Sequence, residues 1–335
     1  MHAATAPAPR RPDARILAVG SDGRTRTVPR TALPDLLRPG DLLVANDAAT
    51  IPASLRGIHR GTGATVEVRL AGRRSLAFDD VRGFTAVLFG AGDHRTPTEL
   101  RPLPPLVAPG DALDLGPLRA TVLEVLGHPR LLRLRFEGPA AQVWDGIARH
   151  GRPIQYAYVP EPLALWDVWT RIAAHPVAFE APSAGFLLDW ELLGHLAGRG
   201  IGFATLTHAA GLSSTGDPAL DARLPLDEAY FIPEATARAV AAAQRVVAVG
   251  TTVTRALEHA GGRSGHGLAT QRIGPGTRLR AVDAILTGVH APGESHFALL
   301  RAFARDPVLE GMNATLEREG FRSHEFGEAV LLYRS

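Results

Sequence analysis

The 335-residue sequence contains no cysteine and no lysine, so all 36 of its non-histidine cations are arginine. Without cysteine there is no disulfide bond, no thiolate nucleophile and no zinc–thiolate site. Without lysine there is no Schiff-base chemistry on the protein and no lysine general base. Arginine suits contacts with phosphate, although a genome-wide bias in codon usage produces the same composition.

Other common signals are also missing. No apolar run is long enough to cross a membrane, and the first fourteen residues, MHAATAPAPRRPDA, lack the apolar core of a signal peptide. We therefore expect a frayed leader on a cytoplasmic protein. The formal net charge is only +2, which does not by itself indicate a nucleic-acid partner. The sequence has no P-loop, no GxGxxG and no serine elbow, and its histidines lack metal-ligand spacing, so we expect no metal site.

The length is sufficient for two domains, and the pattern of apolar and polar residues changes between residues 61 and 137. Short alternating runs are punctuated there by glycine and proline, which is typical of a small antiparallel barrel or sandwich. Residues 1–60 and 138–335 have mixed α/β character. We therefore predict a larger α/β domain with a smaller β-barrel inserted at 61–137. The barrel's arginines Arg69, Arg73, Arg74, Arg133 and Arg135 form either a basic face for RNA or an ordinary solvated face.

The α/β part is organised around the stretch RVVAVGTTVTRALE, Arg245–Glu258. Its valine-rich run predicts a buried strand that ends at Gly250, where the chain turns into a helix. Thr251 and Thr252 then lie at N-cap positions, and the start of such a helix favours a carboxylate or phosphate. Arg255 and Glu258 share one face of this helix. The other interpretation is an ordinary strand–helix unit with threonine caps.

Polar residues also follow several other predicted strands. Because strand ends gather in one crevice of an open α/β sheet, these residues can converge on a single site. They are Asn46 and Asp47, His208, the Gly250-Thr251-Thr252 corner, Asp283 and His290. Each has a structural alternative as a turn, capping or surface residue. The loop His208–Asp217 is either a ligand loop or a long connector, and Ser183 lies in a second small-residue loop, Ala181–Phe186.

Six segments carry a resemblance to a known family. They are Arg38–Leu55 (RPGDLLVANDAATIPASL), Ala181–Phe186 (APSAGF), Thr205–Gly211 (TLTHAAG), Val247–Glu258 (VAVGTTVTRALE), Ile273–Pro292 (IGPGTRLRAVDAILTGVHAP) and Phe326–Leu332 (FGEAVLL). Their content and order resemble the S-adenosylmethionine:tRNA ribosyltransferase-isomerase family of queuosine biosynthesis. The resemblance implies an α/β domain with an inserted barrel, S-adenosylmethionine as co-substrate and tRNA as a partner.

The resemblance also implies a chemistry. A base removes a proton from the 5′ carbon of S-adenosylmethionine, adenine and methionine leave, and the ribosyl carbons end on 7-aminomethyl-7-deazaguanine in tRNA. His208 and His290 are then candidates for proton transfer, with Asp283 orienting one of them. Ser183, Ala184, Gly185, Gly250, Thr251, Thr252, Arg255 and Glu258 are expected to bind the cofactor, and Asn46, Asp47 and Glu228 the substrate.

The sequence departs from the family pattern in places. The family's NDTRV-type segment reads NDAAT at 46–50, and Leu187 replaces a histidine after the APSAGF loop. The histidine-rich stretch before Glu228 becomes Leu224-Pro225-Leu226, and the NFHLP-type segment reads GVHAP at 288–292. We therefore expect a divergent paralogue that retains the cofactor. The alternatives are a paralogue that uses a small acceptor or cleaves S-adenosylmethionine, and a non-catalytic protein that binds an adenosyl ligand or RNA.

Overall fold

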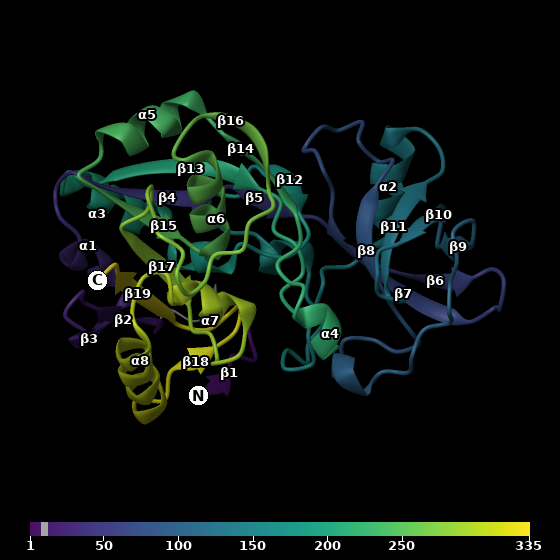
Figure 1. Cartoon of the computed structure of the whole chain (residues 1–335), viewed down its shortest axis with the longest axis horizontal. Helices are drawn as coiled ribbons and strands as arrows, with labels where there is room; N and C mark the ends of the chain where they lie inside the picture. The colour runs from purple at the N-terminus through teal and green to yellow at the C-terminus, as the bar shows by residue number, and fades with distance from the viewer. Residues whose placement is uncertain (8–12) are drawn as a thin grey trace.

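The computed structural model describes residues 1–7 and 13–335, and it contains a large α/β part beside a smaller β-barrel (Figure 1). The large part is built on a nine-stranded mixed sheet. In spatial order its strands are β16 (Gly265–Ala269), β14 (Glu228–Ile232), β13 (Gly202–His208), β4 (Asp41–Asn46), β15 (Arg245–Val249), β17 (Ala284–Gly288), β19 (Ala329–Tyr333), β2 (Arg15–Val19) and β3 (Thr25–Pro29). The four adjacent strands β13, β4, β15 and β17 run parallel. The predicted fold class is confirmed.

The parallel strands are apolar because both faces of the sheet are covered. Val246 and Ala248 of β15 face a core with α6, α7 and α8, and Val247 and Val249 face a second core with α3 and the 3₁₀ turn η5. Strands buried in this way read as continuous apolar runs. The helices on the first face are α5 (Glu234–Ala242), α6 (Thr251–Ala260), α7 (Ser295–Leu300) and α8 (Asp306–Arg318), and those on the second are η2 (Arg30–Ala32), α1 (Leu33–Leu36), η5 (Ser183–Leu187) and α3 (Trp190–Gly198).

The smaller part is a closed six-stranded antiparallel barrel with its own core. Around the barrel the strands are β10 (Leu118–Val125), β11 (Leu131–Phe136), β8 (Phe84–Phe89), β7 (Thr65–Gly72), β6 (Ser54–His59) and β9 (Ala112–Leu115), and a turn η3 (Thr98–Leu100) lies in the β8–β9 connection. The barrel begins before residue 61, because β6 pairs with both β7 and β9. Helix α2 (Ala140–His150) packs on the barrel through Val143 and Ile147.

The arginines expected on the barrel surface do not form one basic face. Arg69 and Arg73 are only 1% and 4% exposed. The guanidinium of Arg73 lies over the Trp144 ring and donates to the carbonyl oxygens of Leu76 and Ala77. Two of the five arginines are therefore internal, and this correction removes the basis for a continuous RNA-binding stripe on the barrel.

The two parts are joined by a connecting layer. A parallel pair, β5 (Ala48–Thr50) and β12 (His175–Ala178), lies between them, together with the short helix α4 (Pro218–Asp221) (Figure 1). Ala209, Ala210 and Leu212 enter the barrel core. Arg130 donates to the Thr215 carbonyl oxygen at 3.4 Å. These contacts anchor the loop 208–217 to the barrel, which favours the connector interpretation.

Several shorter segments complete the fold, and the start of the chain differs from the expected frayed leader. Residues 163–174 form only a 3₁₀ turn, η4 (Leu165–Val168), and the glycine-rich stretch 259–270 contains β16, which pairs with β14. Residues 279–282 form no strand; the strand of that region is β17. The expected leader is ordered at its start, where β1 (His2–Ala3) pairs with β18 (Arg322–Ser323), while residues 8–12 lie outside the described part of the chain.

None of the helices in residues 1–7 and 13–335 has the length and apolarity needed to span a bilayer. Over the same residues, no three or more histidine, aspartate or glutamate side chains are grouped so that they would hold a metal ion.

Candidate functional site

All the predicted strand-end residues except Asp283 lie at one edge of the sheet. Asn46, His208, Val249 and Gly288 are the last residues of four adjacent parallel strands. Gly250 directly follows β15, and His290 lies two residues after the end of β17. In an open α/β sheet this carboxyl edge is where ligands bind.

The corner between β15 and α6 is tightly built. Gly250 is the N-cap residue, with φ 96°, a conformation that residues other than glycine rarely adopt. A Cβ atom at Gly250 would lie 3.3 Å from the Cβ of Ala184 in η5, so the APSAGF loop rests on the corner. The expected threonine cap is absent: α6 begins without a side-chain cap. The first amides of the helix are therefore left for other acceptors.

Beside this corner lies a cavity of about 180 Å³. One wall is η5 with the residues that follow it, and the other is the segment 324–329, with Gly288 of β17 between them. Ser183 and Ala184, two of the residues expected to bind the cofactor, line the cavity, whereas Gly185 packs toward Thr170. Its charged rim includes Arg171 and an ion pair of 2.6 Å between Arg30 and Asp189.

The wall formed by residues 324–329 has an unusual backbone. His324 has φ 67°, and it is the only non-glycine residue with positive φ in the described chain. Its ring stacks on Tyr158 at a centroid distance of 4.4 Å, and the Tyr158 hydroxyl donates to Glu325. Non-glycine residues in this region of φ/ψ space concentrate at functional sites.

His208 lies in a sealed polar cluster and does not line the cavity. The residue is fully buried, and neither ring nitrogen has a hydrogen-bond partner, although Nε2 lies 3.5 Å from the carboxylate of Glu228. Burial, with the nearby Arg255 charge, holds the pKa of His208 well below its usual range. The imidazole is therefore neutral at physiological pH, and this placement gives it no route for exchanging protons with a ligand.

Arg255 and Glu228 are partners of each other. The Nη1 of Arg255 donates to Glu228, and its Nη2 donates to the carbonyl oxygens of Leu226, Ala269 and Gln271. Glu228 also accepts a hydrogen bond of 2.6 Å from the Gly211 amide. Burial raises the pKa of Glu228, and the Arg255 charge opposes that rise. The pair ties α6 to β14 and β16 and presents no free donor to a ligand.

Two further predicted residues have structural partners. Glu258 accepts from the backbone amides of residues 280–282, at 2.9–3.1 Å. Asp283 precedes β17, so it lies at the opposite end of that strand from His290. It accepts from the Val246 amide at 3.0 Å and from Arg334 at 2.9 Å. Asp283 therefore cannot orient His290.

The predicted substrate residues of β4 are also engaged. The Asn46 side chain bridges to the backbone of His208, donating to its carbonyl oxygen at 2.9 Å and accepting from its amide at 3.0 Å. Asp47 accepts from the Thr207 hydroxyl at 2.7 Å. Both side chains are buried, so they brace the sheet edge beneath the site.

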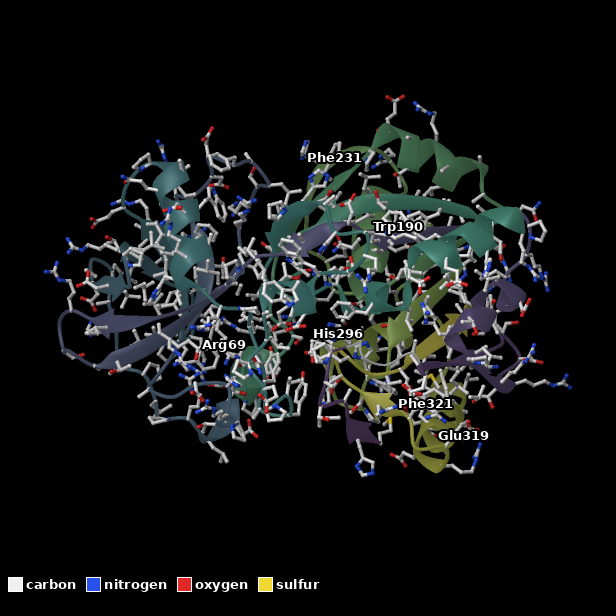
Figure 2. The ribbon with its side chains drawn as sticks, turned by 180° about the vertical axis from the view of Figure 1, so that it is seen from behind. Arg69, Trp190, Phe231, His296, Glu319 and Phe321 are labelled. Carbon is white, nitrogen blue, oxygen red and sulfur yellow. The ribbon has the colours of Figure 1, made fainter. Side chains whose placement is uncertain are left out.

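His290 differs from His208 because it is partly exposed. Its Nε2 lies 3.1 Å from the Thr287 hydroxyl, its Nδ1 lies 3.5 Å from Glu294, and its ring stacks on His296 at 4.7 Å. Burial and the neighbouring His290 lower the pKa of His296 to about 3, so that ring stays neutral. His296 lies where the α/β part faces the barrel (Figure 2).

Several residues that line the cavity are not predicted from the sequence. No role is assigned from the sequence to Arg30, Trp169, Arg171, His324 or Glu325, all of which line the cavity. A signal was present for the last two, because they directly precede the family-like segment Phe326–Leu332. The others come from segments that the fold, and not the sequence order, brings together.

The architecture defines a class of protein. Proteins of this class have a mixed α/β sheet whose carboxyl edge can bind a ligand, and an antiparallel barrel inserted into the same chain. The family model described as "Queuosine biosynthesis protein" matches residues 1–332. The chain therefore belongs to the queuosine biosynthesis protein family.

Individual relatives agree with this assignment. The chain is 33% identical to the S-adenosylmethionine:tRNA ribosyltransferase-isomerase of Sorangium cellulosum, over 98% of this chain and 94% of the relative. It is 35% identical to the Rubrobacter xylanophilus protein of the same name, over 90% and 84%. A crystal structure of S-adenosylmethionine tRNA ribosyltransferase from Thermotoga maritima has the same fold, with a TM-score of 0.51, 22% identity and coverage of 98% and 95%.

Proposed function

We propose that this protein is an S-adenosylmethionine:tRNA ribosyltransferase-isomerase. It would transfer and isomerise the ribosyl moiety of S-adenosylmethionine onto 7-aminomethyl-7-deazaguanine in tRNA. The observation that carries the proposal is the match to relatives of that name across both the α/β part and the barrel. A cavity at the carboxyl edge of the sheet, walled by two of the family-like segments, supports it.

The cavity beside Gly250 is our proposed S-adenosylmethionine site. Ser183 and Ala184 provide small walls, and Trp169 and Phe186 provide apolar surface for the nucleoside. Arg171 supplies positive potential for the methionine carboxylate. The start of α6 supplies more, because it has no side-chain cap and lies behind Ala184, which contacts Gly250. Arg255 and Glu258 are left out of this proposal because their side chains are satisfied within the protein.

Of the two predicted histidines, we assign ligand proton transfer to His290 only. It follows the end of β17, it is partly exposed, and Glu294 and Thr287 hold its ring. His208 instead supports the buried Glu228–Arg255 pair. His290→Gln is therefore expected to slow turnover, whereas His266→Gln, at an exposed position on the edge strand β16, serves as the matched control.

The function is tested by incubating the protein with S-adenosylmethionine and measuring adenine and methionine. We expect both products only when tRNA bearing the aminomethyl-deazaguanine is added. Adenine without tRNA would contradict the assigned acceptor and indicate a small acceptor or simple cleavage. Tight binding of S-adenosylmethionine without any product would contradict catalysis.

A further inference from the structure

A second, smaller cavity adjoins the proposed cofactor site. It has a volume of about 20 Å³, and Glu325 and Phe326 line both cavities. The smaller one is also lined by Glu180, Tyr156 and Tyr158. A cavity of this size holds one water molecule where polar groups such as these line it. Glu325 thus borders the ligand space on one side and a water-sized space shared with a second carboxyl group on the other.

Glu180 is held firmly in this wall. It is 9% exposed, it accepts from the Tyr156 hydroxyl, and its other oxygen accepts from the Ser213 amide at 3.1 Å. The Tyr156 oxygen also lies 3.0 Å from the Ser214 carbonyl oxygen. When Glu180 is protonated, it can donate to Tyr156, which then donates to Ser214. The network therefore satisfies both protonation states of Glu180.

We propose that Glu325 and Glu180 form a proton relay, in which Glu325 takes the proton from the 5′ carbon of S-adenosylmethionine and Glu180 receives it through the small cavity. The C–H bond breaks, its electron pair stays on the carbon beside the sulfonium sulfur, and an O–H bond forms on Glu325. That proton then passes to Glu180, and Glu325 returns to the carboxylate. This inference rests on the proposed function. It assigns removal of the 5′ proton to Glu325 and leaves the other proton transfers of the reaction to His290.

The charges around Glu180 suit a proton acceptor. Burial and the neighbouring Glu325 charge raise the pKa of Glu180 to about 7, against the hydrogen bonds from Tyr156 and Ser213 and the charge of Arg69. Tyr158 and His324 stack beside Glu325, and burial with the Glu325 charge raises the pKa of Tyr158, so its hydroxyl remains a donor. A proton acceptor is most effective when its pKa is close to the working pH.

The test is the pH profile of adenine release with modified tRNA. For the wild type, kcat should rise with pH and level off above about pH 7, as Glu180 loses its proton. Glu325→Gln should lower kcat by about 10²–10⁴-fold, with partial rescue by Glu325→Asp. Glu180→Gln should lower kcat less and remove the inflection near pH 7. Glu161→Gln, an exposed glutamate in the same region, should leave the profile unchanged.

An infrared titration without substrate separates the possible failures. The wild type should show a protonated carboxyl band that disappears near pH 7 and is absent from Glu180→Gln, while thermal unfolding checks that each variant is folded. Full activity in folded Glu325→Gln, or an unchanged inflection in Glu180→Gln, overturns the relay and leaves the proposed function intact. A wild type that releases no adenine overturns the proposed function and, with it, the relay.

Discussion

At the scale of single residues, the carboxyl edge of the sheet gathers residues from four adjacent strands. Asn46, His208, Gly250 and His290 lie at one sheet edge, as their positions after buried strands predict. The partner of each side chain depends on distant segments, which a pattern along the chain does not reveal. Arg255 is an example. The helical pattern places it on a face that could meet a ligand, but its side chain is enclosed by the carbonyl oxygens of Leu226 and Ala269.

Replacing Arg255 tests its structural role. Arg255→Gln should lower the free energy of unfolding by about 3–5 kcal/mol, because Glu228 loses its counter-charge in a buried site. Urea denaturation at pH 7 measures this loss. Arg263→Gln, at an exposed position near the end of the same helix, should change stability by no more than about 0.5 kcal/mol. A similar small change for Arg255→Gln would show that its bonds do not support the fold.

At the scale of elements, the corner from β15 to α6 is the best-predicted part of the chain. A valine-rich strand and a glycine before a helix are local signals, and both are present in the structure. The barrel strand β7 shows the opposite case. Its alternation predicts an outward polar face, yet Glu67 and Arg69 are buried because Arg101 and Tyr156, from distant segments, cover them.

The corner glycine gives a prediction of its own. Gly250→Ala should cost about 1–3 kcal/mol, since alanine is strained at φ 96° and its methyl group would press on Ala184. Thermal or urea unfolding measures the cost. Gly311→Ala, in open space within α8, should instead stabilise the protein by about 0.5–1 kcal/mol. Equal effects of the two substitutions would contradict the strained-corner interpretation.

The buried charges of the barrel predict a dependence on pH. Burial alone would raise the pKa of Glu67, but the charges of Arg69 and Arg101 lower it to about 2. The stabilisation is therefore complete above the unfolded pKa, about 4.3, and is lost as the pH falls toward 2. Glu67→Gln should be about 3–5 kcal/mol less stable than the wild type at pH 7. This difference should be smaller at pH 3, because the wild type has begun to lose the same stabilisation.

Urea unfolding of this variant at the two pH values is compared with that of Glu124→Gln, whose partner Arg133 is 3.3 Å away on the outer surface. The control should retain the stability and the acid sensitivity of the wild type, because exposed ion pairs contribute little. Equal acid sensitivity of Glu67→Gln and the wild type would mean that Glu67 is not the group responsible.

At the scale of the whole molecule, the family resemblance and the change in sequence pattern predict the inserted barrel. The start of the barrel is set by strand pairings of β6 that the sequence pattern does not show. Strand β6 lies before the change, and residues from 209–220 complete the barrel core. Figure 2 shows the α/β part and the barrel from behind, with Arg69 on the barrel side and Trp190 on the α/β side.

This shared core predicts cooperative unfolding. A calorimetric scan should show one transition, with equal calorimetric and van't Hoff enthalpies, because the loop that completes the barrel is anchored in the α/β sheet at His208. Two separate transitions would show that the barrel and the α/β part are energetically independent.

The central claim is that the cavity beside Gly250 holds S-adenosylmethionine. The most direct measurement is a crystal structure of the protein with that ligand bound. We predict its nucleoside between η5 and residues 324–329, its carboxylate toward Arg171 and the start of α6, and its 5′ carbon against Glu325. Ligand density at any other site, with this cavity empty, would contradict the account.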